Sequence, residues 1–192
     1  MSILDYFELV DMSSFSFDQK EVENKFSYLH IDKSTTYQKL SEYDIVILGV
    51  EEERNTSNKG THLAPDKIRE QFYKLNQNGK TRILDIGNLR IGKSLKDTYT
   101  AIRDVVFELV QKNIVPIIIG GGQDLTYGIY LGLDKLNHPI SIVSIDPKLD
   151  LGYKKTILIR NLIWGKLFWK KGKISLISPI LVIKLTIAPR KS

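Results

Sequence analysis

The chain has 192 residues, of which 42% are hydrophobic and 26% charged, values typical of globular domains rather than of disordered chains. It has no cysteine, which excludes disulfides and thiolate metal sites. Its net charge of +6 is unevenly spread, because all 22 acidic residues precede Lys154 together with 18 of the 28 basic ones. Residues 1–153 are therefore mildly acidic, and we expect neither nucleic-acid nor membrane binding from them.

The first regular pattern along the chain begins at Asp44. Residues 1–40 are polar and aromatic with weak periodicity, and we interpret them as an N-terminal lead-in containing one short helix. Residues 44–50 are a short apolar run with β-branched side chains, which predicts a buried strand. The polar residues 51–63 then have the composition of a loop.

A helix and a second strand follow this loop. Residues 64–75 predict a helix with a proline in its first turn. Its apolar face is expected to consist of Ile68, Phe72 and Leu75. Residues 82–88 predict the second strand.

The pattern then repeats. Residues 94–113 predict a long amphipathic helix that Ser94 caps. Its apolar stripe is Ile102, Val105, Val106, Leu109 and Val110. A third strand is expected at 115–119, a helix weakened by two glycines at 124–136, and a fourth strand at 140–146.

Strands that alternate with helices across short loops indicate right-handed crossovers and a parallel sheet. The expected fold is therefore α/β, with three layers (α/β/α) and a mostly parallel sheet that is incomplete. We assign the α/β domain to residues 41–153 and treat 154–192 as a separate basic, apolar tail. Sites in such sheets form at the carboxyl ends of strands, which directs attention to the loops that follow them.

The third strand runs into a glycine turn formed by Gly120, Gly121 and Gly122, with Gln123 and Asp124 next. Glycines at a strand-to-helix turn let backbone N–H groups approach a bound group closely. The same residues also suit a tight turn with no ligand, and the turn alone does not separate the two interpretations.

Asp146, Lys148 and Asp150 follow the fourth predicted strand. Alternation in an extended segment points the three side chains to one side. Two carboxylates would suit a hard cation if the middle residue also donated a lone pair, which a protonated lysine cannot do. By spacing alone, an ion-paired turn is the simpler interpretation.

The loop after the first strand contains Asn58, Gly60 and Thr61, which are candidates for the substrate side of a site. His62 stands beside them, although a lone loop histidine is more often solvated than a ligand.

These segments together resemble the ureohydrolase superfamily, which includes arginase, agmatinase and formimidoylglutamase. The resemblance covers residues 44–152 and rests on N-x-G-x-x-x-A-P-x-x-I-R at 58–69, a strand ending in Asp-Ile-Gly, and Gly-Gly-Gly-Gln-Asp at 120–124. It closes with D-x-K-x-D at 146–150. The formimidoylglutamase-like branch is the most similar, since its triple glycine is followed by His and an acid.

The resemblance implies an arginase-like fold and hydrolysis of C–N bonds in small guanidino or formimino compounds. Family members use two manganese ions, which lower the pKa of a bridging water. At the family's ligand positions Asp146 and Asp150 match, whereas Gln123 and Lys148 replace histidines, and no acid follows Asp150 to supply the later Asp-x-Asp. We therefore expect no bound manganese and no catalytic residue that functions in this chain. Two alternatives remain: a non-catalytic protein that binds a small molecule or a protein, and a surface-binding protein that acts through the basic residues at 154–192.

The tail at 154–192 has ten Lys and Arg residues and no acid. It has two explanations, a change of reading frame near Tyr153 or a real appendage that binds surfaces. Without a signal-peptide pattern or an apolar run long enough for a membrane span, we expect a cytoplasmic protein. A homo-oligomer remains open.

Overall fold

The computed structural model describes residues 2–11, 13, 15, 27–28, 33–75, 79–137 and 140, with side chains left out at 27–28 and 33–35. The chain divides into two units, Met1–Leu136 and Asn137–Ser192, and the sheet and its helices belong to the first. Residues 141–146 of the predicted fourth strand, the D-x-K-x-D segment and the tail at 154–192 lie outside the described residues.

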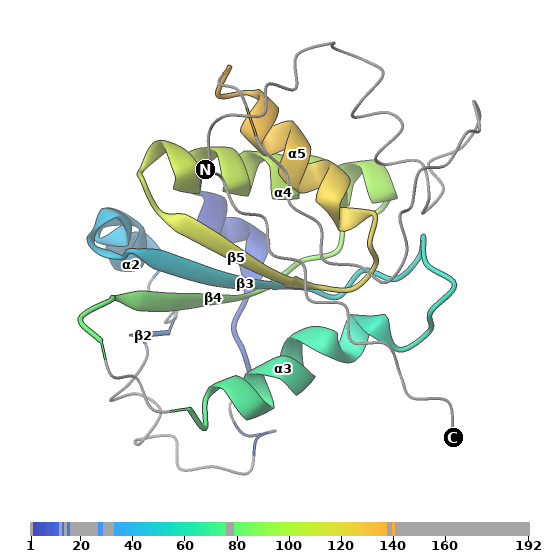
Figure 1. The fold of residues 1–192 in the computed structure, drawn as a ribbon, viewed down its shortest axis with the longest axis horizontal. Helices are drawn as coiled ribbons and strands as arrows, with labels where there is room; N and C mark the ends of the chain where they lie inside the picture. The colour runs from blue at the N-terminus through green and yellow to red at the C-terminus, as the bar shows by residue number, and fades with distance from the viewer. Residues whose placement is uncertain are drawn as a thin grey trace. The chain divides into compact units, whose positions relative to one another are not determined.

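The described residues form a sheet of five strands: β1 (Phe7–Glu8), β2 (Ser27–Tyr28), β3 (Ile45–Val50), β4 (Ile83–Leu89) and β5 (Val115–Gly120). Figure 1 labels β2 to β5. Their order is β1-β4-β3-β5, with β2 paired to the start of β4 and β1 to its end. β3 runs parallel to both β4 and β5, β2 runs parallel to β4, and only β1 is antiparallel among these described pairs. The mostly parallel sheet that the sequence predicts is therefore confirmed.

Helices cover both faces of the sheet, which gives the predicted three layers. In Figure 1, α4 (Leu95–Gln111) and α5 (Leu125–Asp134) lie on one face and α3 (Ala64–Phe72) on the other. The remaining helical segments are α2 (Lys33–Gln38) and the 3-10 turns η1 (Ile3–Tyr6), η3 (Leu40–Glu42) and η4 (Thr61–Leu63). None of the helices in the described ranges has the length and apolar composition needed to span a membrane.

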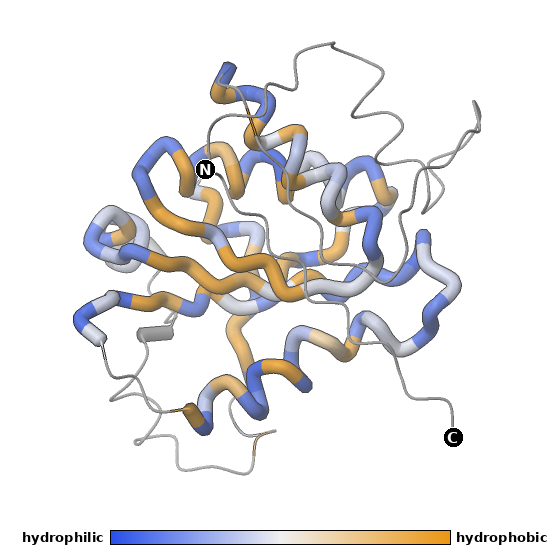
Figure 2. The backbone as a smooth tube through the Cα atoms, viewed as in Figure 1, coloured by the Kyte–Doolittle hydropathy of each residue, from blue (hydrophilic) through white to orange (hydrophobic). Residues whose placement is uncertain are grey.

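The core lies between the sheet and α4. The central strands appear as continuous hydrophobic segments in Figure 2, as expected for parallel strands buried on both faces. Ser94 caps α4 as predicted, accepting a hydrogen bond from the N–H of Asp97, while the Asp97 carboxylate accepts one from the N–H of Ser94. Four of the five predicted stripe residues of α4 are buried, and Val110 is only half-buried.

The prediction for α3 is wrong in its buried face. Leu75 lies beyond the end of the helix with 59% of its surface exposed, and Ile68 and Phe72 are half-buried. The face that meets the sheet instead carries Pro65 and Arg69. A charged side chain occupies the core side of the helix because β4 supplies a carboxylate, that of Asp85, to pair with it.

The two glycines in α5 have a packing role that the sequence alone does not show. A Cβ atom at Gly128 would lie 3.0 Å from Cβ of Ile102, and one at Gly132 would lie 2.9 Å from Cβ of Val106. Small residues at these positions therefore let α5 lie close against α4. The lead-in also differs from its prediction, because β1 and β2 add strands to the sheet edge.

Candidate functional site

The carboxyl ends of β3 and β5 lie side by side, and their loops are bonded to each other. The N–H of Gly121 donates to the carbonyl of Val50 at 3.2 Å, and that of Gly122 to the carbonyl of Glu52 at 2.8 Å. A Cβ atom at Gly121 would lie 1.9 Å from the Glu52 carbonyl oxygen, so only glycine permits this approach. The glycine turn and the loop after β3, predicted separately, thus form one edge of the sheet.

Glu52 is the buried centre of this edge, with 1% of its surface exposed. Its carboxylate accepts hydrogen bonds from the backbone N–H of Arg54 and from the Arg54 Nε, both at 2.9 Å. Thr98, in the first turn of α4, also donates to it at 3.3 Å. Burial alone would raise the pKa of Glu52, but the hydrogen bonds from Arg54 hold it below its ordinary value.

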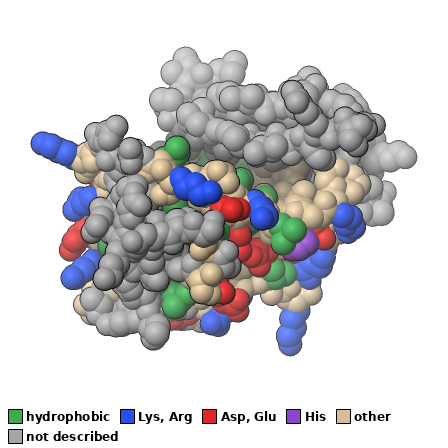
Figure 3. All heavy atoms as spheres, turned by 90° about the horizontal axis from the view of Figure 1, so that it is seen from below, with side chains coloured by type: hydrophobic (Ala, Val, Ile, Leu, Met, Phe, Trp, Pro, Cys, Tyr) green, Lys and Arg blue, Asp and Glu red, His purple; other side chains and the backbone are tan. Residues whose placement is uncertain are grey.

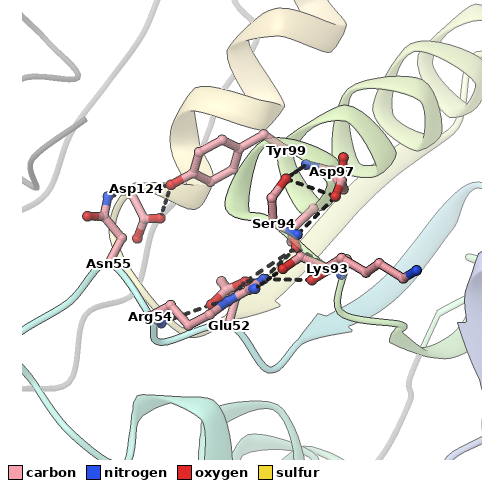
Figure 4. Close-up of polar contacts among 10 residues, drawn as sticks. Glu52, Arg54, Asn55, Lys93, Ser94, Asp97, Tyr99 and Asp124 are labelled. Atoms are coloured by element: carbon pink, nitrogen blue, oxygen red, sulfur yellow. Dashed lines mark hydrogen bonds and ion pairs between the residues drawn. The ribbon is translucent and has the colours of Figure 1, made fainter. Parts of the chain in front are cut away.

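Arg54 connects this carboxylate to the loop before α4, as Figure 4 shows. Its guanidinium donates to the carbonyls of Gly92 and Lys93, each at 2.9 Å. The ion pair therefore joins the loops after β3 and β4, and the backbone carbonyl of Glu52, which accepts from Gly122, adds the loop after β5. This explains how a polar end of the sheet keeps a fixed shape.

Asp124, the last residue of the glycine segment, faces α4 rather than the loops. The Tyr99 hydroxyl donates a hydrogen bond to its Oδ2 atom, and Asn55 donates weakly to that hydroxyl at 3.5 Å (Figure 4). Burial and the neighbouring carboxylate raise the pKa of Tyr99. The Oδ1 atom of Asp124 is buried and accepts no hydrogen bond within the described structure, which is unusual for a buried carboxylate.

The loop candidates Asn58, Gly60 and Thr61 lie before α3. Gly60 adopts a left-handed conformation (φ 85°) and donates its N–H to the Glu53 carboxylate at 2.8 Å. The same carboxylate faces Nδ1 of His62 at 2.8 Å, so this histidine is hydrogen-bonded as well as partly solvated. The backbone of Asn58 donates to Thr56 at 3.1 Å, and Thr61 Oγ1 is a buried hydroxyl without a described partner.

Glu51 belongs to an acidic patch on the α3 side of this edge. Partial burial, with Asp66 as the next cause, raises the pKa of Glu51. Asn88 of β4 donates to its carboxylate at 2.8 Å. Acidic side chains gather on this face in Figure 3, with a histidine beside them. Among the described residues, no three or more His, Asp or Glu side chains are arranged to hold a metal ion.

A second polar cluster lies beneath β3 and β4, and the sequence interpretation missed it. Arg69 is fully buried and donates to both carboxylate oxygens of Asp85, each at 2.9 Å. Tyr73 and the N–H of Gly87 complete the coordination of Asp85, at 2.7 and 2.9 Å. Burial alone would lower the pKa of Arg69, but Asp85 raises it above its ordinary value.

This cluster explains two segments of the sequence resemblance. A-P-x-x-I-R supplies Arg69, and Asp-Ile-Gly supplies Asp85 and Gly87, so both motifs serve the interior of the domain. The signal available in the sequence was an aspartate, Asp85, inside an otherwise apolar strand, with an arginine, Arg69, on the preceding helix.

The candidate metal ligands divide between described and undescribed residues. Gln123 lies in the turn before α5, directly after the glycines, whereas Asp146, Lys148 and Asp150 lie outside the described residues. The chemistry of this donor set does not fit a pair of manganese ions. An amide oxygen is a weak ligand, and a protonated lysine has no lone pair.

Comparison with known proteins agrees with this geometry. The arginase family profile matches residues 43–162. A formimidoylglutamase from Lysinibacillus sphaericus is 31% identical over 104 residues, which are 51% of this chain and 32% of that protein. A mitochondrial guanidino acid hydrolase from Mus musculus is 28% identical over 113 residues, 53% of this chain and 32% of that protein. The aligned region thus spans about a third of these relatives.

Solved structures show the same fold. The formimidoylglutamase of Bacillus subtilis superposes with a TM-score of 0.64 at 14% identity, covering 83% of this chain and 52% of that one. The Trypanosoma cruzi formiminoglutamase, solved with manganese, gives 0.61 at 18% identity, covering 67% and 48%. Since the family match extends over more than half of the sequence, the chain belongs to the arginase family.

Proposed function

We propose that this chain derives from the amidine hydrolases of the arginase family and does not itself hydrolyse C–N bonds. The observation that carries the proposal is Gln123. The glycine turn before it keeps its close bonds to Val50 and Glu52, while the residue at the family's histidine position is an amide. On this proposal, the backbone of the glycine turn is kept, and the side chain that would bind a metal ion has changed from histidine to glutamine.

The class of compound follows from the relatives. Their names include formimidoylglutamase, guanidino acid hydrolase and agmatinase, which act on small linear amidines. We expect any small molecule that this chain binds at the strand ends to belong to that class. The acidic patch beside β3, which includes Glu51 and Asp66, suits the positive charge of an amidinium group.

A non-catalytic role is the second candidate, and the pattern at 146–150 favours it. Lys148 stands between Asp146 and Asp150, where its ammonium group would take over the charge that metal ions supply in the family. Such a protein would keep the strand-end loops as a binding surface for a small molecule or a protein partner.

Manganese binding and hydrolysis, measured separately, test the proposal. After dialysis against micromolar manganese, we expect the native chain to retain less than one equivalent and to release no formamide or urea from formimino or guanidino substrates. Gln123→His with Lys148→His should recover weak metal binding without hydrolysis, because the sequence has no acid after Asp150. Gln111→His, on the exposed end of α4, is the matched control. A tightly held equivalent in the native chain, or measurable turnover, would sink the proposal.

A further inference from the structure

Asp124 carries a buried charge that the described residues do not balance. Only 2% of this residue is exposed. Each of the other buried charged side chains that the structure describes faces an opposite charge: Glu52 faces Arg54, and Arg69 and Asp85 face each other. No ion pair within the described ranges includes Asp124. An uncompensated buried carboxylate is costly, so a cation that reached it would bind favourably.

The two carboxylate oxygens of Asp124 differ in their hydrogen bonds. Oδ2 accepts one from the Tyr99 hydroxyl, whereas Oδ1 is buried and accepts none within the described structure. Because burial raises the pKa of Tyr99, this hydroxyl stays protonated and supplies no positive charge. Buried polar atoms are almost always hydrogen-bonded, so the open oxygen and the unbalanced charge both indicate a missing donor.

The surroundings of the Oδ1 atom come from two loops that the structure describes. A Cβ atom at Gly122 would lie 2.1 Å from Oδ1 and 3.6 Å from Cβ of Thr56. Oδ1 therefore lies against the glycine turn, opposite the loop after β3. Figure 4 shows Asp124 next to Asn55, which belongs to the same loop. The open oxygen thus lies between the loops after β3 and β5, at the carboxyl ends of these strands.

The chemistry of this position favours an organic cation over a metal ion. A hard metal ion needs several oxygen ligands, and no three or more His, Asp or Glu side chains of the described residues are arranged to hold one. A cation that carries N–H groups needs only one acceptor. We propose that Asp124 binds the amidinium group of a small linear amidine, one N–H group of which donates to Oδ1. This inference rests on the class of compound proposed above.

The glycine turn has to move when such a ligand binds, because Oδ1 is covered in this structure. The N–H of Gly122 donates to the carbonyl of Glu52 at 2.8 Å and so closes the turn over the loop after β3. Consecutive glycines permit a change of backbone conformation at low cost. The Gly122 amide should therefore report on binding at Asp124.

Titration of the full chain with small compounds tests the proposal. Formamidinium is planar, positively charged and carries N–H groups. Formamide has a similar size and N–H groups but no charge, and tetramethylammonium is a cation without N–H groups. At constant ionic strength, only formamidinium should shift the NMR signal of the Gly122 amide. An equal shift with formamide or tetramethylammonium, or no shift with formamidinium, would overturn the proposal.

A substitution locates the binding atom. Asp124→Asn keeps the shape of the side chain but removes its charge, and it should weaken formamidinium binding ~10-fold or more. Asp104→Asn is the matched control, because it makes the same chemical change in α4, where Asp104 pairs with Arg103 and Lys135. It should leave the affinity within about twofold of native, since distant charges are screened. Equal affinities in Asp124→Asn and Asp104→Asn would contradict the proposal.

A second variant keeps the test decisive if Asp124→Asn disturbs folding. Tyr99→Phe leaves the Asp124 charge in place and frees Oδ2, so it should strengthen formamidinium binding ~3-fold. Weaker binding by Tyr99→Phe would overturn the proposal. Ammonia release, measured in the same samples, tests the proposed function separately. Turnover of formamidinium would sink the absence of hydrolysis, whereas the comparison of Asp124→Asn with the native chain would still decide the role of Asp124.

Discussion

Two buried carboxylates on either side of β3 differ in how completely they are bonded. Asp85, on the α3 side, accepts hydrogen bonds at both oxygens from Arg69, Tyr73 and the backbone of Gly87. Asp124, on the α4 side, accepts one from Tyr99 at Oδ2 and none at Oδ1 within the described structure. An unsatisfied buried acceptor costs about 1–3 kcal/mol.

The difference indicates that the Asp85 cluster has a structural role, whereas Asp124 belongs to the candidate site. The Asp85 cluster is closed within the chain, as expected of a network that holds α3 to the sheet. The Asp124 carboxylate has an open acceptor at the strand ends, beside Gln123. The open oxygen therefore lies among the loops at the carboxyl ends of the strands, where parallel sheets form their sites.

The largest effect is expected from breaking the closed cluster. Arg69→Met leaves Asp85 buried without its charge partner and should lower the free energy of unfolding by about 3–5 kcal/mol. Denaturant unfolding measures the change. Lys67→Ala, on the exposed side of the same helix, removes only a surface pair with Glu70 and should cost less than about 1 kcal/mol. Equal effects from the two substitutions would show that the Arg69 cluster does not stabilise the domain.

Glu52 should come next, because its carboxylate holds the Arg54 side chain that joins the loops after β3 and β4. Glu52→Gln removes the charge that holds Arg54 and should cost about 1–3 kcal/mol. The pKa of Glu52 is lower in the folded chain than the ordinary 4.5, so its contribution is present above that value and is lost as the pH falls through the folded pKa.

Unfolding measured from pH 7 down to pH 3 should therefore show a steeper loss for the native chain than for Glu52→Gln. Glu42→Gln, in η3 and away from the strand ends, serves as the control and should keep the native slope. Parallel pH profiles for native chain and Glu52→Gln would contradict a stabilising role for this carboxylate.

The sequence predicts the strands and helices well where periodicity reflects burial. The runs at 44–50, 82–88 and 115–119 became β3, β4 and β5 with boundaries shifted by one residue at most. The parallel topology placed the glycine turn and the loop after β3 at carboxyl ends of strands, and the structure joins them by backbone hydrogen bonds. Strand-end geometry is thus accessible from the sequence pattern alone.

The errors arose where a polar residue took an interior position. Periodicity treats Arg69 as solvent-facing, and only its pairing with Asp85 on a different element reverses this. The two-residue strand β1 is too short to show alternation. The contact between Tyr99 and Asp124 depends on how α4 and α5 approach the sheet, which no local pattern contains. The residues at 146–150 remain a prediction.

Tyr99→Phe tests the Asp124 carboxylate, because it removes the hydroxyl that donates to Asp124 Oδ2. Loss of the hydroxyl leaves Asp124 buried with no donor among the described residues, and we expect a destabilisation of about 1–3 kcal/mol. Tyr127→Phe is the control. The Tyr127 ring packs edge-on against the Tyr99 ring, with 5.8 Å between the ring centroids, and Tyr127 is more exposed than Tyr99. If Tyr99→Phe were as mild as Tyr127→Phe, Asp124 would have to be satisfied by another donor.

The smallest effect is expected at the Glu53–His62 pair. Its hydrogen bond to His62 holds the pKa of Glu53 below the ordinary value, and its carboxylate also fixes the N–H of Gly60 at 2.8 Å. Because this pair is solvent-exposed, Glu53→Ala should leave global unfolding unchanged within error and should act only on the loop. The protection of the Gly60 amide against hydrogen exchange should fall in Glu53→Ala.

In the native chain, the protection of this amide should also fall as the pH drops through the pKa of Glu53 in the folded chain, since protonation of the carboxylate weakens it as an acceptor. Glu70→Ala, on the outer side of α3, should leave this amide as it is. If neither Glu53→Ala nor low pH changed the protection of the Gly60 amide, the left-handed turn at Gly60 would hold the loop without the Glu53 carboxylate.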